Sequence, residues 1–220
     1  GYTFGGWYSD EALTEPITAI AGGSTGAVTV YAKWTANTYT VKMHLNNNTA
    51  DVISQTFTFD VRAALTKHNA TYTGYSFVGW ATEANGDAIY TNGAKLSNLT
   101  DEANGTVHLY GIWEPVVYTV SYQNLFEASN NPSNPTEFTV LNKTIIVEAP
   151  VGEREGYNFA GWYADEMLTV PIMGSYTVNE AHNISIYAKW DANPYSVTFN
   201  NNLRDGSALG EATQLMVYGS

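Results

Sequence analysis

The stretch GYTFGGW occupies residues 1–7, and the same phrase returns as GYSFVGW at residues 74–80 and as GYNFAGW at residues 156–162. A pattern written three times indicates an internal repeat, which constrains the fold more than local propensity does. The tyrosine and the phenylalanine of each copy share one strand parity, whereas the tryptophan has the other. The glycine before the tryptophan therefore predicts a β-bulge or a close backbone approach that returns the tryptophan to the core.

Two further phrases follow in a fixed order, and both alternate between apolar and polar residues. They read VTVYAKW at 28–34, VHLYGIW at 107–113 and ISIYAKW at 184–190, then TYTVKMHLN at 38–46, VYTVSYQN at 117–124 and PYSVTFN at 194–200. Alternation with a period of two predicts half-buried strands. The small residues at Ala32, Gly111 and Ala188 predict that a bulky group packs closely over that point of the strand.

The spacing of Trp34, Trp113 and Trp190 gives a unit of about eighty residues, near the lower end of domain size. The frame predicts the C-terminal half of a repeat over 1–36, complete repeats over 37–115 and 116–192, and the N-terminal half of a repeat over 193–220. Either the sequence is a window on a longer array, or the terminal halves of neighbouring molecules complete one another. We favour the window, because end-to-end completion would generate open filaments and would lack a helix.

One segment of the complete repeat 37–115 has helical spacing. Asp60 is a suitable N-cap, and Val61, Ala64, Leu65 and His68 follow on one helical face. The corresponding stretch LNKTIIVEAP at 141–150 is rich in β-branched residues and ends in proline, which favours a shorter helix or an irregular segment. The expected fold class is α+β and β-rich, with a twisted sheet and one short helix per unit.

Together the three phrases resemble the Listeria-Bacteroides repeat, also called the internalin B-repeat type, over essentially the whole chain. The resemblance implies a small β-grasp-like domain, repeated in tandem as an extended array in large secreted or surface-attached bacterial proteins. The family pattern contains no catalytic group. The positions that carry the pattern, which we expect to be structural, are Tyr2, Phe4, Trp7, Trp34, Tyr75, Phe77, Trp80, Trp113, Tyr157, Phe159, Trp162 and Trp190.

The charge balance excludes several classes of partner. The 220 residues carry a net charge of −12 with only nine lysines and arginines, so no basic surface is expected for nucleic acid or for an anionic bilayer. No apolar run is long enough to cross a bilayer, so we expect no direct membrane insertion. Cysteine is absent, which excludes disulfides and leaves the redox compartment open.

The residues that commonly carry catalysis or bind metals are sparse and unpatterned. The four histidines, His44, His68, His108 and His182, occupy unrelated repeat positions, and no nucleophile motif is present. We expect no enzyme, no cofactor, no catalytic residue and no metal site. EANGD at 83–87 faintly resembles a calcium loop, but Asn-Gly predicts a turn more simply.

The roles of two kinds of surface residue, the acidic pairs and the glycosylation sequons, stay open at this point. The acidic pairs at 10–11, 101–102 and 165–166 are interpreted as solvated loop charges. Glycosylation is a weak hypothesis, because the number of sequons is close to chance. The sequons lie at Asn47, Asn69, Asn98, Asn104, Asn142 and Asn183.

The predicted function is that of a structural spacer, stalk or fibre segment of an extracellular or cell-surface bacterial protein. The expected partners are neighbouring repeats of the same or an adjacent chain. Trp34, Trp113 and Trp190 end their units and are expected to pack against the next one. The alternative is an adhesive module in which exposed aromatic side chains bind a host protein or a glycan. Against it, every tryptophan has a repeated strand position, whereas recognition residues usually lie on variable loops.

Overall fold

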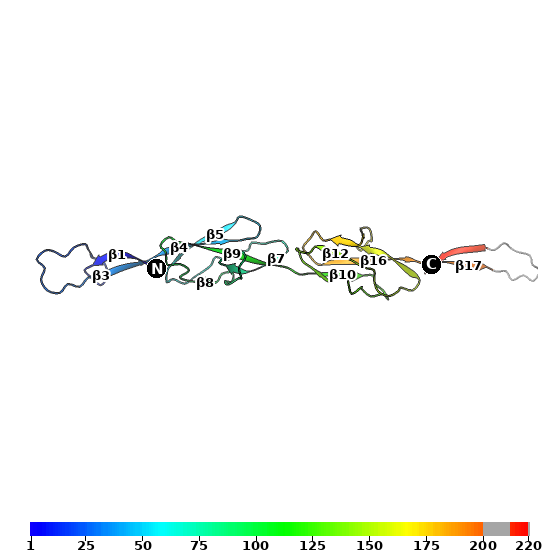
Figure 1. Ribbon diagram of the computed structural model, residues 1–220, viewed down its shortest axis with the longest axis horizontal. Coiled ribbons are helices and arrows are strands. Elements are labelled where there is room, and N and C mark those ends of the chain that lie inside the picture. Colours follow the sequence, from blue (N-terminus) through cyan, green and yellow to red (C-terminus); the bar gives the residue numbers. More distant parts are fainter. Residues whose placement is uncertain (200–211, 220) are drawn as a thin grey trace, which may run out of the picture. The chain divides into compact units, whose positions relative to one another are not determined.

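The computed structural model describes residues 1–199 and 212–219, and the regular structure of these residues consists of β-strands alone. The chain divides into two compact units, Gly1–Glu114 and Pro115–Ser220, each of which is described by itself (Figure 1). The strands are β1 (Tyr2–Tyr8), β2 (Pro16–Ile17), β3 (Tyr31–Ala36), β4 (Thr38–His44), β5 (Val52–Thr58), β6 (Ala63–Ala64), β7 (Tyr75–Ala81), β8 (Lys95–Leu96), β9 (Thr106–Pro115), β10 (Tyr118–Gln123), β11 (Glu137–Phe138), β12 (Thr144–Ile146), β13 (Tyr157–Tyr163), β14 (Pro171–Ile172), β15 (Ser175–Thr177), β16 (Ile184–Ala192), β17 (Pro194–Phe199) and β18 (Ala212–Val217).

Each unit contains one mixed sheet. The order is β5-β4-β9-β7 in the first unit and β11-β10-β16-β13-β14 in the second. The pairs β4–β5, β10–β11, β13–β14 and β13–β16 are antiparallel, whereas β4 pairs in parallel with β9 and β10 pairs in parallel with β16. The sheet therefore places the first and last long strands of each repeat side by side.

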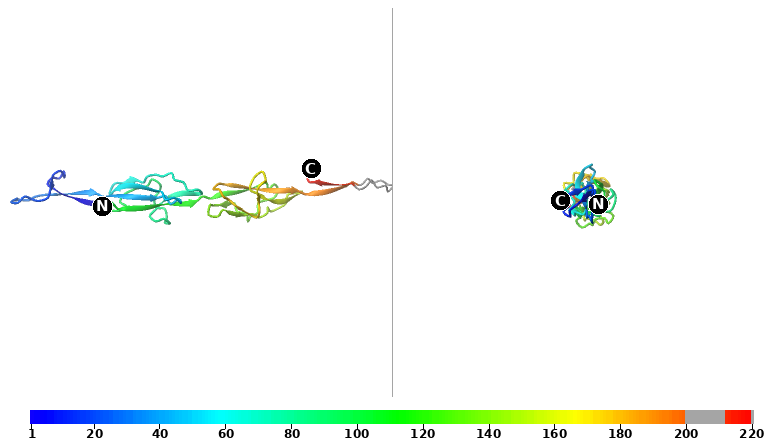
Figure 2. Two further views of the ribbon diagram at one scale, coloured as in Figure 1. Left: turned by 90° about the horizontal axis from the view of Figure 1, so that it is seen from above. Right: turned by 90° about the vertical axis from the view of Figure 1, so that its left-hand side faces the viewer.

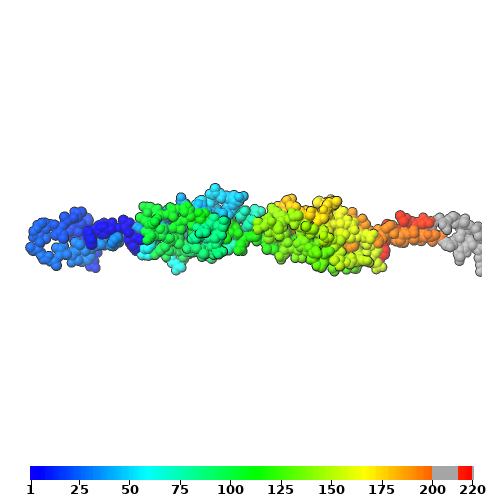
Figure 3. Space-filling model, in the orientation of Figure 1, coloured from blue at the N-terminus to red at the C-terminus, as the bar shows by residue number. Residues whose placement is uncertain are grey.

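The predicted strand alternation is confirmed in β4 and just beyond it. Tyr39, Val41, Met43 and Leu45 are all buried, and they form one core with Phe57, Leu65, Trp80 and Leu109. The second unit has an equivalent core, in which Val120, Phe138, Ile145, Trp162 and Ile186 are buried together. Figure 3 shows the surface of the repeat around the first core, coloured cyan to green.

The predicted helix is wrong, and the fold class is all-β in the described residues rather than α+β. Asp60 is not an N-cap but a turn residue with φ of 62°, and Ala63–Ala64 form β6, which pairs with β8. In the second unit β12 pairs with β15 at the corresponding place. Parallel strands need a crossover connection, which is usually a helix. Here a two-stranded sheet lies within that connection.

Side-chain amides explain why the segment after Asp60 stays extended. Gln55 accepts a hydrogen bond from the backbone N–H of Thr66 (2.7 Å) and donates one to the carbonyl of Ala64 (2.8 Å). Asn92 bonds both the N–H and the carbonyl of His68. These amides act as a neighbouring strand would and satisfy backbone groups that a helix would have satisfied internally. Leu65 still reaches the core, because alternation and helical spacing both place it on an inner face.

The predicted irregularity before the tryptophan is confirmed in all three copies. The pairing register shifts between Phe4 and Trp7 and between Phe159 and Gly161, and Gly6 and Gly161 have φ of 109° and 130°. In the second copy the irregularity is a close approach instead, because a Cβ at residue 79 would lie 2.6 Å from the carbonyl oxygen of Tyr90. The predicted tight packing over Gly111 is also present, since a Cβ there would collide with the carbonyl of Leu45.

The chain segments at either end form smaller sheets. Residues 1–36 form the three-stranded sheet β2-β1-β3, and β17 pairs with β18 in a hairpin, drawn in orange and red in Figure 2. Neither sheet contributes to the two buried cores. Each of these sheets contacts a complete repeat at the junction between them, which is described below.

Candidate functional site

The site that bears on the predicted spacer role is the junction between consecutive repeats, and each unit contains one. In the first unit the N–H of Asn37 donates to the carbonyl of Gly1 (2.8 Å), and the N–H of Phe59 donates to the carbonyl of Asn37 (2.8 Å). Asn37 lies between β3 of one repeat and β4 of the next. Its backbone thus bonds both repeats at the point where one passes into the other.

The second unit contains the same arrangement. The N–H of Asn193 donates to the carbonyl of Gly156 (2.8 Å), and the N–H of Tyr218 donates to the carbonyl of Asn193 (3.1 Å). Asn193 lies between β16 and β17, three residues after Trp190, just as Asn37 lies three residues after Trp34. The junction is therefore built twice by the same backbone bonds.

An aromatic ring from the following repeat covers the leading glycine at both junctions. A Cβ on Gly1 would collide with the ring of Phe59, and a Cβ on Gly156 would collide with the ring of Tyr218. Each ring also packs edge to face against the tyrosine that follows the glycine. The centroids are 5.7 Å apart for Phe59 and Tyr2 and 5.6 Å apart for Tyr218 and Tyr157. We call this arrangement the glycine socket.

Polar side chains add to the junction in the first unit. The Tyr2 hydroxyl donates to the Asp60 carboxylate (2.8 Å), which also accepts from the Asn98 amide (2.7 Å). The bond to Asp60 raises the pKa of Tyr2, whereas the bonds from Asn98 and Tyr2 lower the pKa of Asp60. The Asn37 amide donates to the carbonyl of Asp101 (2.9 Å) and accepts from Thr3 (2.6 Å). The side chains of Tyr2, Thr3, Asn37 and Asp60 thus connect the sheet of residues 1–36 to the repeat that follows.

These junctions join repeats whose recurring phrases agree with one known family model. The model of the Listeria-Bacteroides repeat domain matches residues 1–33, 39–106 and 118–189, as three tandem copies.

The chain belongs to the Listeria-Bacteroides repeat family.

Two relatives come from Evansella cellulosilytica. One, named "Putative Gly-rich membrane protein", is 31% identical over 96% of this chain and 23% of its own length. The other, named "Putative membrane protein", is 30% identical over 100% of this chain and 31% of its own length. The chain thus spans less than a third of either relative. No solved structure matches the chain.

The matched family model describes a repeat domain, and the match brings no catalytic domain with it. Over residues 1–199 and 212–219, no three histidine, aspartate or glutamate side chains gather closely enough to hold a metal ion. The same residues include no helix that could span a membrane. EANGD forms a turn, in which the N–H of Gly86 donates to the carbonyl of Glu83 (3.1 Å).

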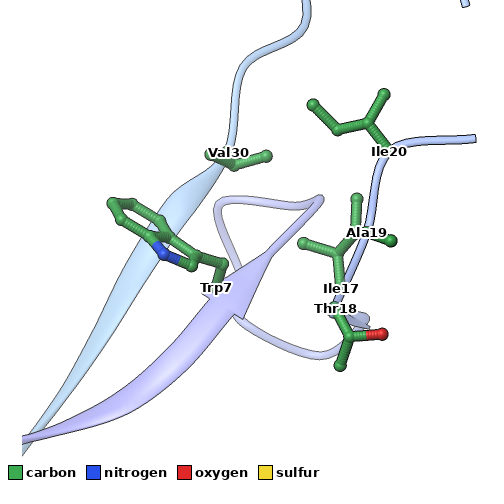
Figure 4. Close-up of a pocket in the computed structure, with 6 residues that line it drawn as sticks. All are labelled: Trp7, Ile17, Thr18, Ala19, Ile20 and Val30. Atoms are coloured by element: carbon green, nitrogen blue, oxygen red, sulfur yellow. The ribbon is translucent and has the colours of Figure 1, made fainter.

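The tryptophans of GYxFxGW lie in different environments. Trp80 and Trp162 are 0% and 3% exposed, whereas Trp7 is 49% exposed. In a complete Listeria-Bacteroides repeat, buried side chains of the first long strand belong to the same core as this tryptophan. In residues 1–36, Trp7 instead lines an open hollow with Ile17, Ile20 and Val30 (Figure 4).

The phenylalanine and the tyrosine of GYxFxGW also make aromatic contacts in each copy. Phe77 packs edge to face on Trp80 and Trp113, and Phe159 packs in the same way on Trp162 and Trp190. Phe4 forms the same pair of contacts with Trp7 and Trp34, but it is 45% exposed. Tyr2 and Tyr157 contribute to the glycine sockets, and Tyr75 stacks on Tyr72.

The tryptophans at the ends of the repeats bond within their own repeats. The indole N–H of Trp113 donates to the carbonyl of Leu45 (2.7 Å), and that of Trp190 donates to the carbonyl of Asn124 (2.8 Å). Both bonds connect the last long strand to the end of the first. Trp34 contacts Phe4, and it is Phe59 and Asn37 that join its sheet to the next repeat. The orienting role expected for these tryptophans at other junctions stays a prediction.

Two of the acidic loop residues have a role that sequence reasoning missed. Asp10 accepts hydrogen bonds from Thr14 and from the N–H of Glu15, and Asp165 accepts the same set from Thr169 and Val170. The bonds from Glu15 and Thr14 lower the pKa of Asp10. At Asp165 desolvation raises the pKa, but the bonds from Val170 and Thr169 outweigh it and the net shift is downward. The shared pattern Asp-Glu-x-Leu-Thr was the available signal.

The structure also brings together two histidines that the sequence placed at unrelated positions. His44 Nε2 lies 2.8 Å from His108 Nδ1, and the His44 ring stacks on Tyr110 with centroids 4.9 Å apart. Burial lowers the pKa of His44, and the charges of His108 and Lys42 lower it further. The parallel register of β4 and β9 creates this pair, because it places Lys42 opposite His108 and His44 opposite Tyr110.

Proposed function

We propose that this chain is a spacer segment of an extracellular or cell-surface protein, in which the junctions between repeats hold neighbouring repeats at a fixed angle. The observation that carries the proposal is the glycine socket with its two backbone bonds, which recurs at Gly1 and at Gly156. A freely hinged linker would leave its backbone groups to water. These linkers instead bond a repeat on each side.

Stiffness in a tandem array arises from contacts between nearest neighbours, because no core runs through the whole chain. Both junctions restrain the next repeat through the linker backbone and an aromatic ring, and the junction at Gly1 adds the hydrogen bond from Tyr2 to Asp60. Short linkers without a Gly/Ser-rich stretch also limit flexibility. The junction thus has the features that a load-transmitting spacer requires.

The location outside the cell is part of the proposal. It is supported by the family and by the names of the two relatives, which describe membrane proteins. The low content of basic residues agrees with a role that needs neither nucleic acid nor an anionic surface as a partner.

Distance measurements across one junction test the proposal. The chain contains no cysteine, so spin labels can be placed at will. Met167 and Leu215, which are 81% and 74% exposed, lie on either side of the junction at Gly156. With both changed to cysteine, we expect double electron-electron resonance to give one narrow distance distribution. A broad distribution that resembles a flexible chain would refute a fixed junction.

The matched variant removes the ring and retains both labels. Tyr218→Ala should broaden the distribution, because it empties the glycine socket while leaving the linker bonds in place. A label pair inside one repeat, at Met167 and Glu153, should be unaffected by the same change. This control separates loosening of the junction from unfolding of the repeat.

A further inference from the structure

One end of the repeat of residues 37–115, which is the second of the three copies, has a hollow of about 350 Å³. The proposed spacer role does not use this hollow. The copy of residues 116–192 is called the third repeat. The hollow is lined by Asn46, Tyr72, Tyr75, Asn85, Ile112 and Trp113. All of these residues belong to the first unit. The hollow combines aromatic rings with amide side chains, which is an unusual composition for a surface that serves only packing.

The aromatic wall of the hollow is held rigidly. The rings of Tyr72 and Tyr75 stack with centroids 4.2 Å apart and an interplanar angle of 12°, and Trp113 meets Tyr72 edge to face at 5.9 Å. A backbone bond from the N–H of Tyr75 to the carbonyl of Tyr72 (2.9 Å) fixes the pair. A ligand that stacks on these rings would therefore lose little of its binding free energy to ordering them.

The polar groups of the hollow are placed but only partly used. The Asn46 amide nitrogen donates to the carbonyls of Ala84 (3.1 Å) and Gly111 (3.0 Å), which directs its oxygen and leaves it able to accept. In the described part of the chain, the hydroxyls of Tyr72 and Tyr75 and the amide of Asn85 have no protein hydrogen-bond partner. The hollow thus offers both donors and acceptors beside an apolar wall.

We propose that this hollow binds a neutral saccharide. A pyranose ring presents an apolar face of C–H groups to an aromatic ring and hydroxyls that both donate and accept at its edge, which is the combination that the hollow offers. No cationic side chain lines the hollow, and the loop of Asn85 also carries Glu83 and Asp87. Sialylated or uronate sugars would therefore meet unfavourable charge.

A proline-rich peptide is the other ligand class that aromatic-lined grooves accept. Such a peptide presents mainly carbonyl acceptors, because proline has no N–H, and so it depends on donors in the groove. The acceptor oxygen of Asn46 would stay unpaired beside such a peptide, whereas a sugar hydroxyl can donate to it. The hollow therefore fits a sugar better than it fits a peptide of this kind.

The third repeat shows that this feature is not a general property of the fold. Arg154 takes the place of Tyr72 there, as its β-bridge to Tyr157 shows. Its guanidinium lies 3.6 Å from the ring centroid of Phe126 and 3.9 Å from that of Tyr157, so a cationic side chain stands where the repeat of residues 37–115 has an aromatic ring. The two complete repeats thus differ at this place, and the hollow beside Tyr72 is formed partly by loops, where recognition residues are expected.

Titration of the full chain with saccharides tests the proposal, and its outcome is independent of whether the junctions are stiff. The probes are neutral oligomers of glucose, N-acetylglucosamine, mannose and galactose, with a proline decapeptide alongside. The signals to follow by ¹H–¹⁵N NMR are the side-chain amide of Asn85 and the indole N–H of Trp113. We expect at least one saccharide to shift both at concentrations up to about 10 mM, which covers weak sites.

The variants locate the binding. Tyr72→Leu removes a stacking ring, and Asn85→Ala removes an exposed amide that has no protein partner, so its fold should be unchanged. Each should weaken binding by about tenfold or more. Phe126→Leu is the matched control, because this 60% exposed ring lies in the third repeat, and it should leave the affinity unchanged. The unchanged indole signal of Trp80 verifies the fold of each variant.

Three results would overturn the proposal. The first is that no saccharide shifts the signals of Asn85 and Trp113. The second is that binding survives both Tyr72→Leu and Asn85→Ala. The third is that the proline decapeptide shifts these signals and no saccharide does, which would assign the hollow to a peptide.

Discussion

The ring of Tyr218 fills the space in which a side chain at residue 156 would stand, and this contact joins two consecutive repeats. Gly156 also has φ of 77°, so its backbone conformation favours glycine for a second reason. Residue 156 is therefore constrained both by its own backbone and by its neighbour. The two constraints can be separated by experiment.

We expect Gly156→Ala to loosen the junction as well as to strain the turn. A left-handed backbone alone costs an alanine about 1 kcal/mol. Gly174 has φ of 78° with no atom within 4 Å of its Cβ position, so Gly174→Ala measures that cost by itself. Only Gly156→Ala should broaden the distance between labels at residues 167 and 215. Equal effects of the two variants would show that the ring contact contributes nothing.

The buried tryptophans of the two complete repeats should respond differently to the same substitution. The indole N–H of Trp162 donates to the carbonyl of Glu148 (2.8 Å), whereas that of Trp80 is buried without a partner. Replacement by phenylalanine removes a satisfied bond in one case and an unsatisfied donor in the other. We expect Trp162→Phe to destabilise its repeat by about 1–2 kcal/mol more than Trp80→Phe does. Native-state hydrogen exchange in each repeat measures both values, and a larger loss at Trp80 would contradict the expectation.

His68 should make the first unit sensitive to acid. Its ring packs on Phe77 and Trp80, both ring nitrogens are buried without a partner, and burial lowers its pKa. The unfolded chain therefore binds a proton at a higher pH than the folded chain does. Stability is fully present above the unfolded pKa of about 6.5 and falls as the pH drops through the lower folded pKa.

The measurement is the free energy of unfolding between pH 7 and pH 5, with His68→Leu expected to flatten the decline. His182 is the contrasting case, because its bonds to Asn183 and Glu180 raise its pKa. Its contribution is present at low pH and is lost as the pH rises, so His182→Gln should not reduce the acid decline. An unchanged slope in His68→Leu would show that another group causes the decline.

Asp165 should stabilise its loop only when ionised. Its net pKa is lowered, so its contribution is present above the usual carboxyl range near 4 and is lost as the pH falls through the folded pKa. We expect Asp165→Ala to lower the melting temperature at pH 7 and to have a smaller effect at pH 3. Glu166→Ala is the matched control, since the adjacent carboxylate is exposed and should give little change at either pH.

The strands and the bulges were predictable because they depend on local pattern. The burial of Tyr39, Val41 and Met43 follows from alternation, and the bulge at Gly161 follows from the opposite parity of Trp162. The extended conformation after Asp60 was not predictable in this way. Val61 to His68 satisfy helical spacing, but the amides of Gln55 and Asn92 bond the same backbone, and no local window contains both partners.

The candidate sites were less predictable, because they depend on residues far apart in the sequence. The leading glycine indicated a chain reversal, whereas its main contact is an aromatic ring 58 or 62 positions later. The hollow beside Tyr72 likewise needs Asn46 and Trp113, which the parallel strand pair brings to one end of the repeat. The residues that the copies share can be read from the repeated phrases. The residues that form the glycine sockets and the hollow are brought together only by the fold.

The parallel pair at the centre of each sheet has a mechanical consequence. The chain enters a repeat at the start of β4 and leaves it at the end of β9, and these points lie at opposite ends of one hydrogen-bonded pair. A pull on the chain from both sides therefore loads the two strands in shear. Their interstrand bonds must break together rather than one after another, so the parallel pair opposes a pull applied along the chain.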